Sequence, residues 1–334
     1  MYLPRHYKID KKKSVNIKPF VLMVLIIGIG FALFSKKKEI QFLFAGNISQ
    51  KYTKLEKKII SGMVSGKIEK EFIGDFQEIS LAFFNSEPTN PSAHHGLAKA
   101  AYYELVTTNF SFDVDKLLHF VTNSNSSSTS LTEVKPILDK IYRNALRAKV
   151  FRNEFPEMDS NQLLISLCET LEGRKRPALI LEQLIQIKYE NISPELKPIF
   201  LWLNFITTVN SGDLDALEAI FEMNKKLESG LNIKIKKREF GFLMGIANYN
   251  QKEYVQALQY FRESRIQKMD FLTIESIKFE ASIFHIQNLH EKAISLLENL
   301  YTTLNNEDET IKEKIRLILL TKPGLRSKLV GLEQ

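Results

Sequence analysis

Six histidines and a single cysteine are the side chains in this chain of 334 residues best suited to metal binding or nucleophilic chemistry. His94 and His95 are adjacent, so on a helix their side chains point about 100° apart and do not easily share a metal. His285 and His290 are five residues apart, with the second in an expected turn. Cys168 falls within an apolar helical pattern. We therefore expect no metal site, no disulfide, and a buried thiol in place of a nucleophile.

Sequence motifs that carry catalysis are also absent. No glycine-rich loop follows a strand pattern, and the chain contains no Walker, HExxH or GxSxG motif. The acidic residues are numerous but form no distinctive pair, so solvated helix faces account for them. The sequence thus predicts a protein that is not an enzyme, with no catalytic residues and no cofactor.

The net charge of +7 is unevenly distributed along the chain. Residues 1–70 contain fifteen lysines and arginines against four acidic residues, whereas residues 71–334 contain 31 basic residues against 35 acidic ones. The basic character therefore belongs to the N-terminal region. Because the body lacks the positive surface that phosphate binding requires, we expect no nucleic-acid partner.

A membrane anchor is predicted near the N-terminus. The stretch that begins at Phe20 and ends at Phe34 reads FVLMVLIIGIGFALF and has no polar side chain. A helix of this length covers about 22 Å, less than the roughly 30 Å hydrocarbon layer. Lysines flank both ends, and they can reach the headgroups while the bilayer thins locally. We therefore predict a single membrane pass.

A cleaved signal peptide or a buried soluble helix are the alternatives for this segment. Lys36, Lys37 and Lys38 stand where a signal peptide would have a small-residue cleavage site, which favours the uncleaved anchor. Positive charges on the two flanks are nearly equal in number, so the positive-inside rule gives little direction. We expect the bacterial inner (cytoplasmic) membrane, with the body on the periplasmic side.

The remaining chain predicts an all-α fold. Glycine (14) and proline (10) are sparse, apolar residues recur at helical spacing, and no alternating strand pattern of useful length appears. The polar run NSNSSSTS is either a bulge from a continuous array or a hinge between two helical halves. The expected organisation is a basic tail (1–18), the anchor (19–35), a charged connecting region and helix (36–70), a helical hairpin (71–120), the polar loop (121–131), helical repeats (132–308) and a capping helix and tail (309–334).

A repeated pattern is clearest within residues 239–300. Residues 244–264 read MGIANYNQKEYVQALQYFRES, in which small residues alternate with aromatic ones at the positions where two antiparallel helices cross. This pattern resembles the tetratricopeptide repeat. Matching positions near 178, 217, 257 and 293 are 39, 40 and 36 residues apart, longer than the 34 residues of the standard repeat. The residues that carry the resemblance are Gly245, Tyr254, Ala257, Phe261, Ala281 and Ala293.

The resemblance implies stacked helical hairpins with a concave groove, lined by the first helix of each pair, that holds a peptide or helix of a partner protein. For Trp202 and Phe242 the alternative is plain core packing. The groove residues that the resemblance implies are Trp202, Ile206, Glu239, Phe242, Ile246, Tyr249, Asn250, Lys278, Ser282 and His285.

From these features we expect a membrane-anchored scaffold or adaptor that binds other proteins. The composition is rich in lysine, asparagine and isoleucine, which is typical of AT-rich bacterial genomes and indicates a bacterial source. With the predicted anchor, we expect the bacterial cell envelope. One expected setting is a structural component of a large membrane machine, such as a flagellar motor collar. The alternatives are a translocon-associated or chaperone-like subunit for exported proteins, and a peptide-sensing regulator.

Overall fold

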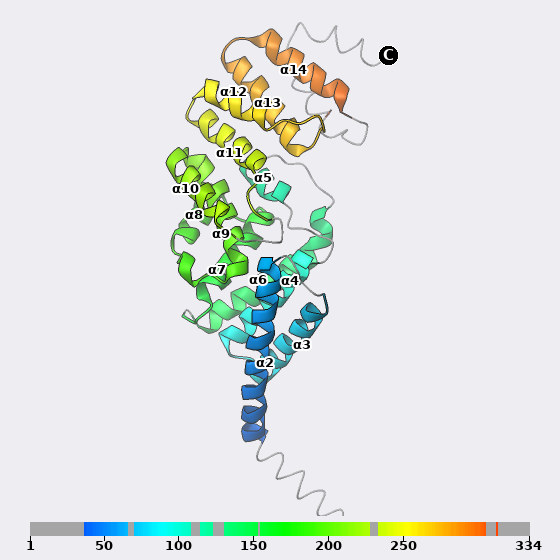
Figure 1. The fold of residues 1–334 in the computed structure, drawn as a ribbon, viewed down its shortest axis with the longest axis vertical. Coiled ribbons are helices and arrows are strands. Elements are labelled where there is room, and N and C mark those ends of the chain that lie inside the picture. Colours follow the sequence, from blue (N-terminus) through cyan, green and yellow to red (C-terminus); the bar gives the residue numbers. More distant parts are fainter. Residues whose placement is uncertain are drawn as a thin grey trace, which may run out of the picture. The chain divides into compact units, whose positions relative to one another are not determined.

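Residues 37–65, 70–107, 114–122, 130–152, 154–227, 233–304 and 312 are described by a computed structural model of the chain (Figure 1). Every regular element in these residues is a helix, which confirms the all-α prediction. The α-helices are α2 (Lys37–Ser65), α3 (Lys70–Ser86), α4 (Pro91–Thr107), α5 (Val114–Thr122), α6 (Ser130–Phe151), α7 (Met158–Leu171), α8 (Pro177–Ile185), α9 (Lys197–Thr208), α10 (Leu214–Lys225), α11 (Lys237–Asn250), α12 (Tyr254–Glu263), α13 (Phe271–Ile286) and α14 (His290–Thr303). Short 3-10 turns are η1 (Tyr189–Asn191), η2 (Pro194–Leu196) and η3 (Val209–Ser211).

The chain forms two compact units, residues 1–50 and 51–334. Among the described residues, no helix is both long enough and apolar enough to cross a bilayer. The predicted tail and anchor at 1–35 lie outside the described residues. So do positions 123–129 of the polar loop and the expected cap at 309–334 apart from residue 312.

From α7 onward, the described residues contain a series of helix pairs: α7–α8, α9–α10, α11–α12 and α13–α14. The two helices of each pair contact each other, and a residue with positive φ stands between them. These residues are Gly173, Gly212, Lys252 and Asn288, with φ of 64°, 69°, 66° and 60°. They are therefore 39, 40 and 36 residues apart, the intervals that the sequence pattern predicts.

The turns also share a backbone hydrogen-bond pattern. After three of the positive-φ residues, the next N–H donates to a carbonyl five residues earlier, which is the Schellman arrangement that ends many helices. The donors and acceptors are Arg174 and Glu169, Glu253 and Asn248, and Leu289 and Phe284, at 2.8–2.9 Å. A common turn thus closes these hairpins, although the residue in the left-handed conformation differs.

The first hairpin corrects one equivalence in the predicted repeat. Helix α8 begins four residues after Gly173, whereas the second helices of the later hairpins begin two residues after their turn residue. Ala178 is consequently exposed, and Ile180 is the fully buried residue in the position that Leu217 and Ala257 occupy later. The turn after Gly173 is two residues longer than the later turns, and the small side chain of Ala178 gives no sign of this in the sequence.

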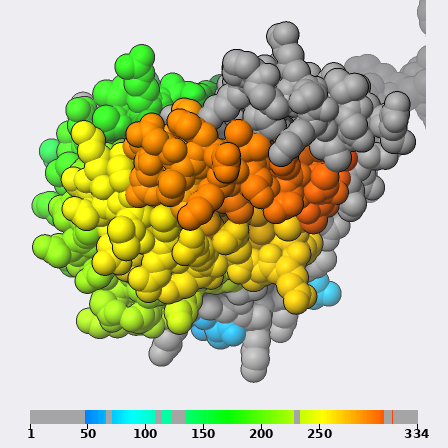
Figure 2. Space-filling model, turned by 90° about the horizontal axis from the view of Figure 1, so that it is seen from above, coloured from blue at the N-terminus to red at the C-terminus, as the bar shows by residue number. Residues whose placement is uncertain are grey.

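Close crossing of α11 and α12 depends on glycine. A Cβ added to Gly245 would lie 2.7 Å from Cε1 of Phe261, and one added to Gly241 would lie 3.1 Å from Oγ of Ser264. The ring of Phe261, fully buried, fills the space that the missing side chain leaves. Figure 2 looks onto α11 to α14 (yellow to orange), where α12, α13 and α14 lie side by side.

Helix α2 packs on the body through one stripe of side chains. Tyr52, Ile59 and Met63 are buried at helical spacing, and the Tyr52 ring lies 5.0 Å from the ring of Phe76 on α3. Gly96 on α4 lets this ring approach, because an added Cβ would lie 3.0 Å from Cε2 of Tyr52. The part of α2 from residue 51 onward is thereby joined to both α3 and α4.

Candidate functional site

Four residues of the predicted concave groove lie in the core. Trp202, Ile206 and Phe242 are 0% exposed and Ile246 is 3% exposed. Trp202 donates its indole N–H to the carbonyl of Ile233 at 2.7 Å, so its polar atom is satisfied internally. These side chains do not line an exposed groove, and packing, the alternative interpretation for Trp202 and Phe242, describes them.

Glu239 has a structural role at the start of α11. Its carboxylate accepts a hydrogen bond from the backbone N–H of Lys236 at 2.8 Å, which caps the helix. Burial raises the pKa of this carboxyl group, and the nearby N–H and charge of Lys236 only partly oppose that shift. Because the side chain is 8% exposed, a partner protein has little access to it.

The other predicted groove residues are half-buried or exposed. Tyr249 contacts the rings of Tyr254 and Phe279, and Asn250 donates to the carbonyl of Val209 at 3.4 Å. Lys278 pairs with Glu275 at 2.7 Å, and the Ser282 hydroxyl donates to a carbonyl one helical turn earlier. These side chains remain half-buried or exposed, and those of Asn250, Lys278 and Ser282 bond within the chain.

His285 and His290 meet across the turn between α13 and α14. Their Nδ1 atoms are 2.9 Å apart, closer than their sequence separation suggested. Two imidazoles supply only half of the ligands that zinc takes in a structural site. Within the described residues, no group of three or more histidine, cysteine or carboxylate side chains is arranged to hold a metal.

Cys168 is 0% exposed, as the sequence predicts. Burial raises the pKa of its thiol above the ordinary value, with the charge of Glu172 adding to the effect. Since the reactive form of cysteine is the thiolate, this side chain is unsuited to nucleophilic attack.

A buried ionic cluster joins α2, α4 and η2. Lys99 on α4 places its Nζ 2.8 Å from Oε1 of Glu56 on α2 and 2.9 Å from Oε1 of Glu195 on η2. It also donates to the Ser193 hydroxyl at 3.0 Å, and Tyr103 donates its hydroxyl to Glu195 at 3.0 Å. The side chains of Lys99 and Glu195 are 2% and 0% exposed. This cluster pins three segments that are far apart in sequence.

The electrostatics of the cluster keep Lys99 charged. Burial by itself lowers the pKa of Lys99, but the carboxylates of Glu195 and Glu56 outweigh that effect and raise it. His95, one helical turn away, is neutral because burial and the charge of Lys99 lower its pKa to about 3. A protonated amine held by two carboxylates is suited to a structural role.

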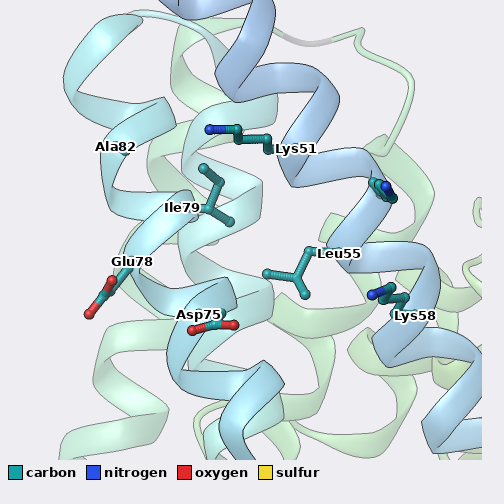
Figure 3. A pocket seen from close by; sticks show the side chains of 8 residues that line it. Lys51, Leu55, Lys58, Asp75, Glu78, Ile79 and Ala82 are labelled. Atoms are coloured by element: carbon teal, nitrogen blue, oxygen red, sulfur yellow. The ribbon is translucent and has the colours of Figure 1, made fainter.

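An open groove lies between α2 and α3. Its volume is about 480 Å³, and its lining combines an apolar floor with charged walls. Figure 3 shows Leu55 from α2 and Ile79 from α3 pointing toward one another across the floor, and Ala82 on α3 adds to the apolar lining. Lys51, Lys54 and Lys58 line the α2 side, and Asp75 and Glu78 line the α3 side.

The charges on the two walls do not neutralise one another. All five side chains are exposed, and within the described part of the chain none of them takes part in an ion pair. Lys58 instead lies 5.2 Å from the centre of the Phe72 ring, a cation–π contact that reaches from α2 to α3. The walls thus present two rows of opposite charge that are available to another molecule.

Comparison of the chain with protein-family models, with curated proteins and with solved structures finds no match.

Sequence reasoning missed both the groove and the ionic cluster, although each left a signal. Lys51, Lys54 and Lys58 follow the i, i+3, i+7 spacing of one helix face. Lys99 stands alone among the small residues of GLAKAA, in a helix expected to pack closely. A lysine on such a face needs buried carboxylates, but nothing in the sequence says which acidic residues those are.

Proposed function

We propose that this protein is a membrane-anchored scaffold of the bacterial cell envelope that binds other proteins. The observation that carries the proposal is the groove between α2 and α3, whose walls hold five charges that have no ion-pair partner among the described residues, above an apolar floor. Surface charges need no partner, but opposite rows on either side of an apolar floor match how proteins recognise a helix or peptide.

Two further features support a binding role over a catalytic one. The helix pairs from α7 to α14 follow one another with a recurring turn, which is typical of repeat arrays that display surfaces to partners. Lys99 and Glu195, two of the buried titratable groups, pair with each other and do not line the α2–α3 groove.

The membrane setting rests on the apolar stretch from Phe20 to Phe34 and its flanking lysines. Anchored there, the protein would hold its partners beside the bilayer, as a component of a membrane machine does. A translocon-associated subunit would hold exported chains at the same place, so the identity of the partners separates the two settings.

The test is crosslinking in cells followed by detergent extraction of the tagged full-length protein and identification of what copurifies. A small stoichiometric set of envelope proteins supports the machine component. A broad set of exported chains with translocon subunits supports the alternative. If no protein copurifies, the scaffold role is contradicted.

A charge variant of the groove sharpens this test. Lys51→Glu, Lys54→Glu and Lys58→Glu together reverse one wall, and we expect at least a tenfold loss of the copurifying partner. The matched control is Lys135→Glu, Lys188→Glu and Lys268→Glu, which changes the net charge equally at exposed lysines outside the groove. Equal losses in both variants would place the binding elsewhere.

A further inference from the structure

The spacing of charges along the α2–α3 groove defines what would fit it. At 1.5 Å per residue, Lys54 and Lys58 lie about 4.5 and 10.5 Å along the helix from Lys51. Asp75 and Glu78 on the opposite wall are about 4.5 Å apart along α3. All five residues line the same groove, so a ligand lying along it meets positive charge on one edge and negative charge on the other.

The floor adds an apolar requirement. Leu55, Ile79 and Ala82 are half-buried, and Leu55 and Ile79 face each other in the groove (Figure 3). Covering such side chains removes apolar surface from water, which drives association at about 25 cal/mol per Å² before the costs of binding. A ligand with polar atoms along its centre would bury those atoms against the apolar floor without hydrogen-bond partners.

We propose that the occupant of this groove is an amphipathic helix of a partner protein with edges of opposite charge. Its apolar stripe covers Leu55 and Ile79, acidic residues at i, i+3 or i+4, and i+7 face the three lysines, and basic residues face Asp75 and Glu78. This inference rests on the proposed scaffold function, and it names the chemistry of the partner.

Other occupants fit the charges less well. An anionic lipid surface would be attracted to the lysines but repelled by Asp75 and Glu78, which are exposed on the opposite wall. A second copy facing the first through the same groove would bring two concave floors together and leave them unfilled. A helix is convex, so its apolar stripe reaches the floor while its two edges reach the walls.

The experiment measures binding of synthetic helical peptides to the detergent-solubilised full-length protein by fluorescence anisotropy. Three peptides share one leucine stripe: one has an acidic and a basic edge, one has two acidic edges, and one has two basic edges. We expect the two-signed peptide to bind at least tenfold more tightly than either of the others. Reversing one wall, with Lys51→Glu, Lys54→Glu and Lys58→Glu, should weaken its binding at least tenfold.

Reversing both walls gives the decisive control. Adding Asp75→Lys and Glu78→Lys to the lysine variant exchanges the two edges of the groove. The two-signed peptide can bind this variant in the reverse chain direction, with its apolar stripe still on the floor and each edge facing the opposite wall. It should therefore regain most of its affinity. A variant that had merely lost its fold would not regain binding, and circular dichroism of each variant checks the helix content directly.

Three outcomes would overturn the inference. The doubly acidic peptide binding equally well would indicate unspecific charge attraction. Failure of the both-wall variant to regain binding would show that the edges do not act as a pair. A change in the sedimentation mass of the full-length protein on reversing one wall would identify a second copy as the occupant. If these occur while partners still copurify from cells, the scaffold function stands and only the groove assignment fails.

Discussion

Two parts of the body differ in what lies at their helix contacts: a buried ionic cluster beside apolar packing in one, and stacked aromatic rings in the other. The N-terminal helices α2 and α4 are joined through the buried charges of Lys99, Glu56 and Glu195. The hairpins from α11 to α13 are joined through aromatic rings, with Phe261 and Phe279 stacked at 5.0 Å and Phe242 meeting both edge-on. A buried charge stabilises the fold only when each of its ion-pair partners is present, whereas the stability from packed rings depends on how well their volumes and shapes match.

The aromatic region also contains charged pairs, and one of them is partly exposed. Arg238 makes a two-point contact with Asp270 at 2.5 Å and also reaches the carbonyl of Ser264, which ties the start of α11 to the start of α13. The side chains of Arg238 and Asp270 are 25% and 30% exposed. Water therefore screens this pair, and its loss should cost far less than the loss of Lys99.

The largest expected effect is at Lys99. Lys99→Met leaves the carboxylates of Glu195 and Glu56 without their counter-charge, and we expect a loss of about 3–5 kcal/mol in the free energy of unfolding. Urea denaturation followed by circular dichroism measures it. Adding Glu195→Leu and Glu56→Leu removes the orphaned charges and should recover most of the loss. An equal free energy of unfolding for Lys99→Met and the parent would show that the cluster does not stabilise the fold.

Two glycine substitutions compare how tightly the two regions are packed. Gly245→Ala places a Cβ 2.7 Å from Phe261 in the close crossing of α11 and α12, and we expect a loss of about 1–3 kcal/mol. Gly74→Ala in α3 meets no atom within 4 Å, so the higher helix propensity of alanine should raise stability by about 0.5–1 kcal/mol. Opposite shifts in thermal midpoint check the prediction, and shifts of the same sign contradict it.

A gain of similar size is expected in the turn between α11 and α12. Lys252 has a φ of 66°, a conformation that costs a residue with a Cβ about 1–2 kcal/mol. Lys252→Gly should therefore stabilise the protein by up to about 1 kcal/mol, the remainder being offset by the freedom of glycine in the unfolded chain. Glu253→Gly, at a φ of −79°, is the matched control and should give no gain.

The smallest effect concerns the response to acid and base. Burial by itself raises the pKa of Asp270, but hydrogen bonds from Arg238 and Thr273 outweigh it and lower the pKa to about 2. The stability from Asp270 is thus present above its unfolded pKa of about 4 and is lost as the pH falls toward 2. Asp270→Asn should remove this acid-dependent part, under about 1 kcal/mol for so exposed a pair.

Lys99 gives the opposite dependence. Because its pKa is raised in the folded protein, its contribution is complete below the unfolded value of about 10.4 and is lost only as the pH rises through the folded value. Urea titrations at acid and alkaline pH, for Asp270→Asn and for Lys99→Met, distinguish the two regions. An alkaline loss of stability that is the same in Lys99→Met as in the parent would contradict this assignment.

The sequence predicted the hairpins well because their determinants are local. Small residues such as Gly245 and large ones such as Phe261 recur at fixed spacing, and the later turn residues are 40 and 36 residues apart, as the pattern predicts. The first interval agrees only in number, because Ile180 and not Ala178 is the equivalent residue. The predicted groove failed at Trp202 and Phe242 because an aromatic side chain at a helix crossing has the same sequence signature whether it faces a neighbour or a partner.

The ionic cluster and the α2–α3 groove could not be derived in the same way. Lys99 is 43 residues from Glu56 and 96 residues from Glu195, and many acidic residues of the chain were equal candidates for the pairing. The groove depends on how α2 lies against α3, which Tyr52 and Phe76 decide through ring contacts between distant positions. Long-range pairing of single side chains leaves no periodic signal.

The packing of α2 also has a mechanical consequence. If the chain is pulled through the residues that precede position 51, tension enters the body at α2. The contacts that resist it are those of Tyr52, Glu56, Ile59 and Met63. Glu56 is held by Lys99, so peeling α2 away exposes a buried amine as well as apolar surface. Short-range ionic contacts of this kind give way over small extensions, so α2 should detach abruptly under load while the aromatic hairpins remain folded.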